Sequence, residues 1–118
     1  MLAITIELLS KYSKDISELD LSKTNSDGLL DLFDFNSLIE LNCSHNKITS
    51  LNNLPNTLIK LDCSYTEIKS LNNLPNSLIE LYCSHTKITS LDLLPNSLIE
   101  LHCYYTKITS LDLLPNNL

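Results

Sequence analysis

A twenty-residue interval organises this sequence. The four cysteines stand at positions 43, 63, 83 and 103, and the residues around them recur at the same interval. The copies read SLIELNCSHNKITSLNNLPN from Ser37, TLIKLDCSYTEIKSLNNLPN from Thr57, SLIELYCSHTKITSLDLLPN from Ser77 and SLIELHCYYTKITSLDLLPN from Ser97. A repeat this short has room for one strand and a tight return, but not for a long helix. Because one copy cannot bury its own apolar residues, the copies must stack into a continuous core.

Each copy places its apolar residues in a fixed frame. In the first regular copy, Leu41 and Cys43 alternate with Asn42, which is the period of a half-buried strand. Since only a short return separates successive strands, the strands must run parallel, about 4.8 Å apart. Ile48 turns back toward the core, and Pro55, which cannot donate a ladder hydrogen bond, suits an extended outer side. The pattern predicts a mostly β solenoid with few or no helices.

The frame L-x-x-L-x-C-x-x-(N/T)-x-I resembles the leucine-rich repeat, whose core is L-x-x-L-x-L-x-x-N-x-L. In the first regular copy these positions are filled by Leu38, Leu41, Cys43, Asn46 and Ile48. Cysteine replaces leucine at the strand centre, and threonine replaces asparagine at positions 66, 86 and 106. The short unit with Leu-Pro before the next strand resembles the repeats of secreted bacterial effectors, and the LPNSL wording resembles repeat proteins of amoebae and their giant viruses. The resemblance implies an α/β-type solenoid, mostly β, coiled in a right-handed sense, with a parallel concave sheet and an extended convex side.

The resemblance covers residues 16–118 and divides the chain into a cap and repeats. We expect an N-terminal cap over residues 1–15, since solenoids need polar ends. The Ile4-Thr5-Ile6 alternation favours an edge strand there, with a short helix as the alternative. One irregular repeat occupies 16–36, four regular repeats occupy 37–116, and 117–118 begin another. A final coil without a cap predicts either a longer array or end-to-end association between molecules.

Charge and cysteine spacing narrow the function. The formal net charge is −6 and all eight basic residues are lysines, which disfavours nucleic acids and anionic membranes as partners. Zinc sites usually bring cysteines in close pairs, whereas one cysteine per copy fits a buried thiol ladder. The Cys43/His45 and Cys83/His85 pairs lie two strands apart, so one ion cannot join them. We expect an intracellular, non-enzymatic protein without a cofactor or a metal.

The outward positions of the predicted strands form four columns on the concave face. The columns are Glu18, Glu40, Lys60, Glu80, Glu100; Asp20, Asn42, Asp62, Tyr82, His102; Ser22, Ser44, Ser64, Ser84, Tyr104; and Lys23, His45, Tyr65, His85, Tyr105. The last two repeats differ only at Tyr82/His102, Ser84/Tyr104 and His85/Tyr105, all within these columns. Selection for contact would explain this, because tyrosine is a favoured interface residue, and drift at exposed positions is the alternative. The predicted binding site is Tyr65, Tyr82, His85, His102, Tyr104 and Tyr105.

These observations favour a scaffold that binds a protein partner on the concave sheet. If the effector or viral resemblance holds, the partner is a host protein. The first alternative is a self-assembling array element, and a metal-binding protein or an enzyme is less favoured. The column Asn46, Thr66, Thr86, Thr106 should hydrogen-bond backbone groups where each strand turns. Because threonine has one donor and asparagine has two, we expect a weaker ladder where threonine stands.

Overall fold

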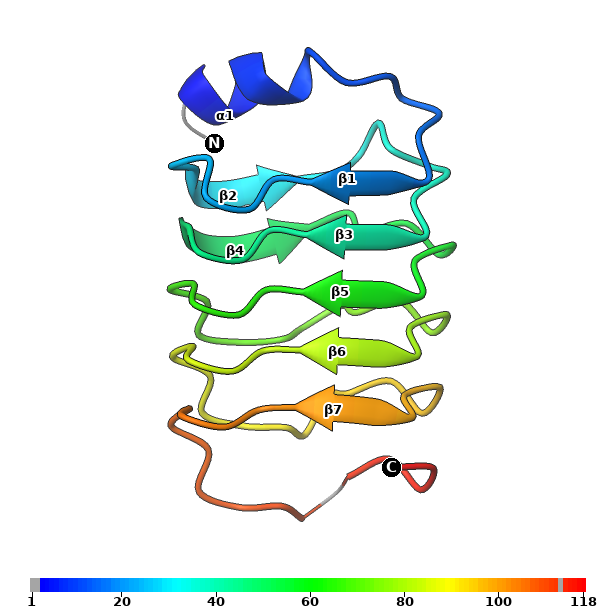
Figure 1. Cartoon of the computed structure of the whole chain (residues 1–118). Helices are drawn as coiled ribbons and strands as arrows, with labels where there is room; N and C mark the ends of the chain where they lie inside the picture. The colour runs from blue at the N-terminus through cyan, green and yellow to red at the C-terminus, as the bar shows by residue number, and fades with distance from the viewer. Residues whose placement is uncertain (1–2, 113) are drawn as a thin grey trace.

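The computed structural model describes residues 3–112 and 114–118, which wind into a stack of coils (Figure 1). One strand from each of five coils contributes to a single parallel sheet in the order β1-β3-β5-β6-β7. These strands are β1 Glu18–Asp20, β3 Glu40–Asn42, β5 Lys60–Asp62, β6 Glu80–Tyr82 and β7 Glu100–His102. Equivalent repeat positions pair across the sheet, so Leu41 lies opposite Leu61 and Leu61 opposite Leu81. The mostly β solenoid predicted from the repeat is confirmed.

The return side of the solenoid carries a second, smaller sheet in its first two coils. Strands β2 Asp27–Asp31 and β4 Lys47–Asn52 pair in parallel, and their register shifts between Gly28 and Leu29. The first coil is longer than the others. Leu19 pairs with Leu41, whereas in the regular coils each leucine pairs with the one twenty residues further on, as Leu41 does with Leu61. Gly28 has a φ of 71°, a left-handed value that glycine adopts without steric cost. The shift therefore falls where the irregular repeat differs from the regular ones.

The core runs through the stack as columns of like residues. Leu41, Cys43 and Ile48 are fully or almost fully buried, and their counterparts in the next two coils are buried as well. Since strand side chains alternate between faces, the leucine and cysteine of each strand segment point inward while the residue between them points out. In the fifth coil Leu101 and Cys103 are only partly buried. The inward register predicted for the leucines and cysteines is confirmed.

Residues Ala3–Leu9 form helix α1, where the sequence alternation had favoured an edge strand. The helical period explains the difference, because Thr5 and Leu9 lie one turn apart and are both buried. In a strand, Ile4 and Ile6 would both face the core, but Ile6 is 52% exposed. The helix lies at the N-terminal end of the stack (Figure 1). Within residues 3–112 and 114–118, no helix has the length and apolar character needed to cross a membrane.

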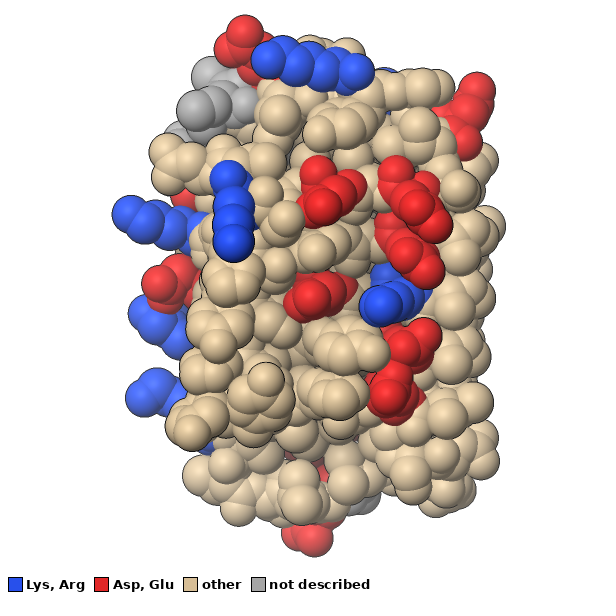
Figure 2. All heavy atoms as spheres, viewed as in Figure 1, with Lys and Arg blue, Asp and Glu red and all other residues tan. Residues whose placement is uncertain are grey.

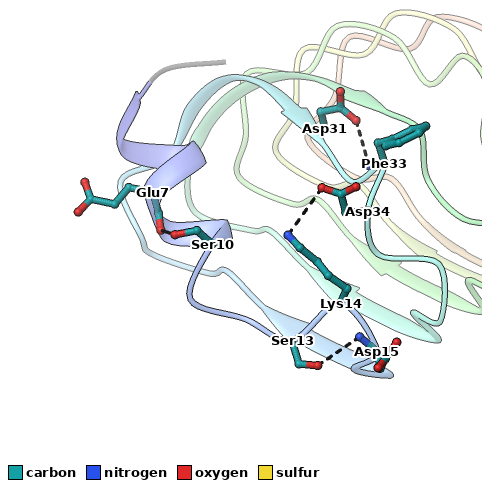
Figure 3. Close-up of polar contacts among 8 residues, drawn as sticks. All are labelled: Glu7, Ser10, Ser13, Lys14, Asp15, Asp31, Phe33 and Asp34. Carbon is teal, nitrogen blue, oxygen red and sulfur yellow. Dashed lines mark hydrogen bonds and ion pairs between the residues drawn. The ribbon is translucent and has the colours of Figure 1, made fainter.

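The segment after α1 contacts the loop that follows β2 (Figure 3). Lys14 Nζ lies 3.7 Å from Asp34 Oδ2 and 4.6 Å from the centre of the Phe35 ring. In the same loop the Phe33 N–H donates to Asp31 Oδ1 at 3.0 Å. Exposed ion pairs of this kind contribute only about 0–1 kcal/mol, so the buried Leu9 and Phe35 side chains hold this end together more than the charges do.

In the column Asn46, Thr66, Thr86 and Thr106, where each strand turns, the asparagine forms more hydrogen bonds than the threonines, as its sequence predicted. Asn46 bonds to backbone groups of its own coil and of the first coil, including the Ser26 N–H at 3.0 Å and the Leu21 carbonyl at 2.8 Å. Thr66 and Thr86 each donate only to a carbonyl of their own turn, at 2.7 and 2.8 Å. The weaker ladder expected at the threonines is confirmed, since a hydroxyl is too short and has too few donors to span two coils.

Candidate protein-binding face

The face of the solenoid that carries the outward side chains of the five-stranded sheet, with the turn after each strand, is called the strand face below. Figure 2 shows this face, with charged residues along both sides, acidic residues also in the middle of its upper half, and uncharged residues in the middle of its lower half. Each strand contributes two outward residues, such as Glu80 and Tyr82 in β6. Three residues further on, the turn contributes another, such as His85, so each coil presents three such positions in a row across the face.

The turn residues have an unusual backbone. Lys23, His45, Tyr65, His85 and Tyr105 all have φ between 52° and 57°. This left-handed conformation costs most residues about 1–2 kcal/mol, because Cβ approaches the following carbonyl. Backbone bonds between coils hold it, since the N–H of His45, Tyr65 and His85 each donates to the next coil at 3.0 Å. The fold therefore fixes where these side chains project, before any side-chain contact is made.

The rings at these turns stack into one continuous column. The centroids of His45 and Tyr65 are 4.4 Å apart, those of Tyr65 and His85 are 4.2 Å apart, and those of His85 and Tyr105 are 4.5 Å apart. The ring planes differ by only 10°, 11° and 22°. Aromatic pairs contribute roughly 0.5–1.5 kcal/mol each beyond the area they bury. Stacking thus offsets part of the backbone cost and holds the rings in a fixed orientation.

Two further groups of rings lie on the same face. Tyr82 and His102 stack on each other across β6 and β7, with centroids 4.5 Å apart. Tyr104 meets both His85 and Tyr105 edge to face, at 5.5 and 5.6 Å. All seven rings together are called the aromatic cluster: His45, Tyr65, Tyr82, His85, His102, Tyr104 and Tyr105.

The six residues predicted from the sequence all belong to this cluster. Tyr65, His85, Tyr104 and Tyr105 touch one another, whereas Tyr82 and His102 form a neighbouring pair. The prediction omitted His45, although it occupies the same repeat position as Tyr65. That shared position was the available signal, because residues one repeat apart lie about 4.8 Å apart in a parallel stack.

One part of the predicted surface is wrong. Ser44 and Ser84 were placed among the outward columns, but both are buried. The Ser44 N–H and hydroxyl both donate to Asn42 Oδ1, at 3.0 and 2.7 Å, which folds the serine back against its own strand. Tyr104, at the same repeat position, is 58% exposed because its ring is too large to be enclosed in this way.

Carboxylates border the lower rings. The Tyr82 hydroxyl lies 3.0 Å from Glu100 Oε2 and 3.1 Å from Glu80 Oε1, and one proton can serve only one of them at a time. The hydrogen bond to Glu100, together with desolvation and the bond to Glu80, raises the pKa of Tyr82 to about 12. Hydrogen bonding to Glu80, Tyr82 and His102 holds the pKa of Glu100 below its ordinary value. The Tyr82 hydroxyl thus lies between the carboxylates of two glutamates that are paired on adjacent strands.

The N-terminal half of the strand face is acidic and hollowed. A hollow of about 400 Å³ is lined by carboxylates of the first three coils with one lysine among them: Glu18, Asp20, Glu40, Asp62 and Lys60. The Ser22 hydroxyl and N–H donate to Asp20 Oδ1 at 2.6 and 2.9 Å, and these bonds lower the pKa of Asp20. Along its middle the strand face is therefore graded, with acidic residues at the N-terminal end and rings at the other.

Two solved structures share this architecture. The structure titled "Structure of Shigella effector LRR domain" is 27% identical with a TM-score of 0.58, over 92% of this chain and 57% of that chain. YopM from Yersinia enterocolitica WA-314 is 29% identical with a TM-score of 0.55, over 70% of this chain and 23% of that chain. The parallel-strand solenoid of this chain is consistent with a leucine-rich-repeat protein of the bacterial-effector type. It spans less than two thirds of either similar structure. No family model matches it, and no curated protein matches it.

The cysteines of this leucine-rich-repeat chain occupy the strand-centre position of the repeat core and face inward. Cys43, Cys63 and Cys83 are buried as free thiols, and Cys103 is partly exposed. Burial raises the pKa of Cys43 and Cys83 to about 12 and that of Cys63 well above its ordinary value. A buried, protonated thiol is a poor nucleophile and a poor metal ligand. Among the described residues, no three His, Cys, Asp or Glu side chains lie close enough together to hold a metal ion.

Proposed function

We propose that this chain is a non-enzymatic scaffold that binds a protein partner through the aromatic cluster on its strand face. The observation that supports this most is the exposure of rings that contact one another: Tyr65, Tyr104 and Tyr105 are 46%, 58% and 77% exposed. Tyrosine brings a large contact area at a low entropy cost, and it is enriched among residues that dominate binding energy. Rings already held by their neighbours lose little further freedom on binding, which favours affinity.

The proposal is non-enzymatic because the chemically reactive groups are separated. The thiols of Cys43 and Cys83 lie in the core, whereas His45 and His85 lie on the strand face, so no thiol has its neighbouring histidine as a base. The Glu100 carboxylate near His102 belongs to an exposed network that also includes Tyr82. Such a network is suited to orienting side chains for recognition.

The similar structures suggest where the partner is found. One of them is titled as a Shigella effector domain, and a chain with the same role would act on a protein of a host cell, in the cytoplasm of the producing or the host cell. We also assign residues 1–15 as the N-terminal cap of this scaffold and 16–118 as its repeats. The position of α1 over the first coil supports the cap (Figure 1).

Partner capture with two matched variants tests the proposal. In the first variant, Tyr82, Tyr104 and Tyr105 are replaced by alanine. In the second, Phe33, Leu93 and Leu111 are replaced, since these are similarly exposed apolar residues that lie outside the strands and turns of the strand face. Capture from a host lysate, read by quantitative mass spectrometry, should yield a protein that the control variant retains and the tyrosine variant loses at least about tenfold. Undiminished capture by a folded tyrosine variant would overturn the proposal.

A further inference from the structure

Two columns of charged side chains flank the strand face on opposite sides, the second of them where the return side begins (Figure 2). The first column stands at the start of each strand, where residues of neighbouring strands pair directly: Glu40, Lys60, Glu80 and Glu100. The second column follows the turn after each strand: Lys47, Glu67, Lys87 and Lys107. The N–H groups of Glu67, Lys87 and Lys107 each donate at 3.0 Å to the preceding coil, so this column advances one coil at a time as well.

The two columns have opposite signs in every coil from the second to the fifth. Glu40 is matched by Lys47 and Glu80 by Lys87, and in the third coil both signs are reversed, with Lys60 matched by Glu67. Each reversal relieves like charges within its own column, as in the 2.6 Å pair of Lys87 Nζ with Glu67 Oε2. Relief of like charges within each column, however, does not require that the reversals of the two columns fall in the same coil.

This complementarity is not used within one molecule. The members of a pair are seven residues apart on opposite edges of the face, with the strand and the ring column between them. Among the ion pairs of residues 3–112 and 114–118, none joins the two columns. A second surface that carries the same pattern with its edges exchanged would match these signs across the face.

A second copy of the chain provides that surface. A two-fold axis parallel to the axis of the solenoid places each coil opposite the same coil of the other copy and exchanges left and right. Glu40 then faces Lys47 of the second copy, Lys60 faces its Glu67, and the fourth and fifth coils repeat the arrangement with Glu80 and Glu100. Because such a contact is isologous, every pair forms twice and the assembly closes at two copies.

The residues that lie between the two charge columns also form suitable pairs about this two-fold axis. It brings the third residue of each strand opposite the turn residue of the same coil, so Asp20 meets Lys23, Tyr82 meets His85 and His102 meets Tyr105. The first coil thus pairs opposite charges, and the last two pair aromatic rings. One pair disagrees, since Glu18 meets Asp27, which stands in the Lys47 column.

The size of the face is adequate for a specific contact. The described residues extend over 40 and 24 Å along the two longest axes of the molecule, which set the upper bounds of any one face. A face within these bounds is comparable to the ~800 Å² that each partner buries in a standard interface.

We propose that two copies of this chain pack strand face against strand face about this two-fold axis, in the register set by the charge columns. The inference goes beyond the proposed function, since it names a second copy as an occupant of the surface assigned there to a partner. Dimer and partner complex then compete, and the dimer protects the exposed rings when no partner is bound.

Charge swaps that keep the net charge constant test this dimer. One variant carries Glu40→Lys with Lys60→Glu, and the other carries Lys47→Glu with Glu67→Lys. Either swap sets like charges against each other at two positions, each occurring twice, and should weaken dimerisation at least about tenfold. A mixture of the two variants restores every match, and so does one chain with all four changes. Sedimentation equilibrium over a series reaching roughly 1 mM covers the range expected for a weak, partly polar interface.

The outcomes separate cleanly. Dimers of the wild type, of the mixture and of the fourfold variant, but not of either swap alone, are the expected result. A monomeric wild type, swaps that dimerise like wild type, no recovery on mixing, or growth beyond two copies would each overturn the inference. Circular dichroism checks that each variant is folded. All seven rings remain in these variants and no partner is needed, so the dimer can fail while partner binding stands, and the reverse.

Discussion

Replacing Asn46 with threonine, the residue that the next three coils carry at this position, should destabilise the chain by removing hydrogen bonds between coils. Asn46 Oδ1 accepts from the N–H groups of Thr24 and Ser26 at 3.2 and 3.0 Å. Its Nδ2 donates to the Leu21 carbonyl at 2.8 Å, and also to carbonyls of its own turn. A threonine hydroxyl would retain the bond within the turn, as Thr86 does with Cys83, and would leave three groups of the first coil without this partner.

The cost follows from what those three groups lose. A buried backbone group without a partner costs about 1–3 kcal/mol, and some relaxation toward water is expected at the edge of a turn. We therefore expect a loss of about 3 kcal/mol in the free energy of unfolding, a large part of the ~5–15 kcal/mol typical of a domain. Equilibrium urea unfolding, followed by circular dichroism, measures it.

Thr86→Ala is the matched control, because it removes one bond within a single turn and should cost about 1 kcal/mol. If Asn46→Thr lies within about 0.5 kcal/mol of wild type, or costs less than Thr86→Ala, then the side chain does not join the first two coils as described.

Two further results are expected. Leu81→Ala should cost about 2–5 kcal/mol in urea unfolding because Leu81 is fully buried in the fourth coil, whereas the exposed Leu93→Ala should stay within about 0.5 kcal/mol of wild type. In an absorbance titration of the five tyrosines, one should ionise near pH 12 and vanish in Tyr82→Phe. Because folding raises this pKa above its ordinary value of 10.0, the Tyr82 contribution to stability is complete below pH 10 and is lost between pH 10 and about 12. Titration of all tyrosines together near pH 10 would contradict the bonds to Glu80 and Glu100.

The repeat made most of the architecture predictable. A constant step of twenty residues fixes which positions stack, so the burial of Leu41 and Cys43 and of their counterparts followed from spacing alone. The outward positions of Tyr65, Tyr82 and Tyr105 followed from the same frame, although Tyr82 is half-buried among its neighbours. Periodicity thus determined both the core and the choice of candidate residues.

The helix α1 and the burial of Ser44 and Ser84 could not be predicted from the repeat. The Ile4-Thr5-Ile6 alternation suggested a strand, but α1 forms because its buried positions are Thr5 and Leu9, a fact of packing on the first coil. Ser44 and Ser84 share the parity of outward residues, yet the backbone turns left-handed at the next residue and encloses them. His45, by contrast, could have been included from the repeat alone, since it stands one repeat before Tyr65 and successive coils lie about 4.8 Å apart.

Thiol labelling tests the central claim most directly, namely that each twenty-residue coil hides its sulfur inside and displays its ring on the strand face. With Cys43 and Cys83 at a pKa of about 12 in place of 9.0, their thiolate fraction near pH 8 falls about a thousandfold, and burial blocks access besides. Mass spectrometry after brief exposure of the native protein to iodoacetamide should find Cys103 modified first. Cys43, Cys63 and Cys83 should react only as fast as the protein unfolds. Equal modification of all four cysteines in the folded protein would contradict the account.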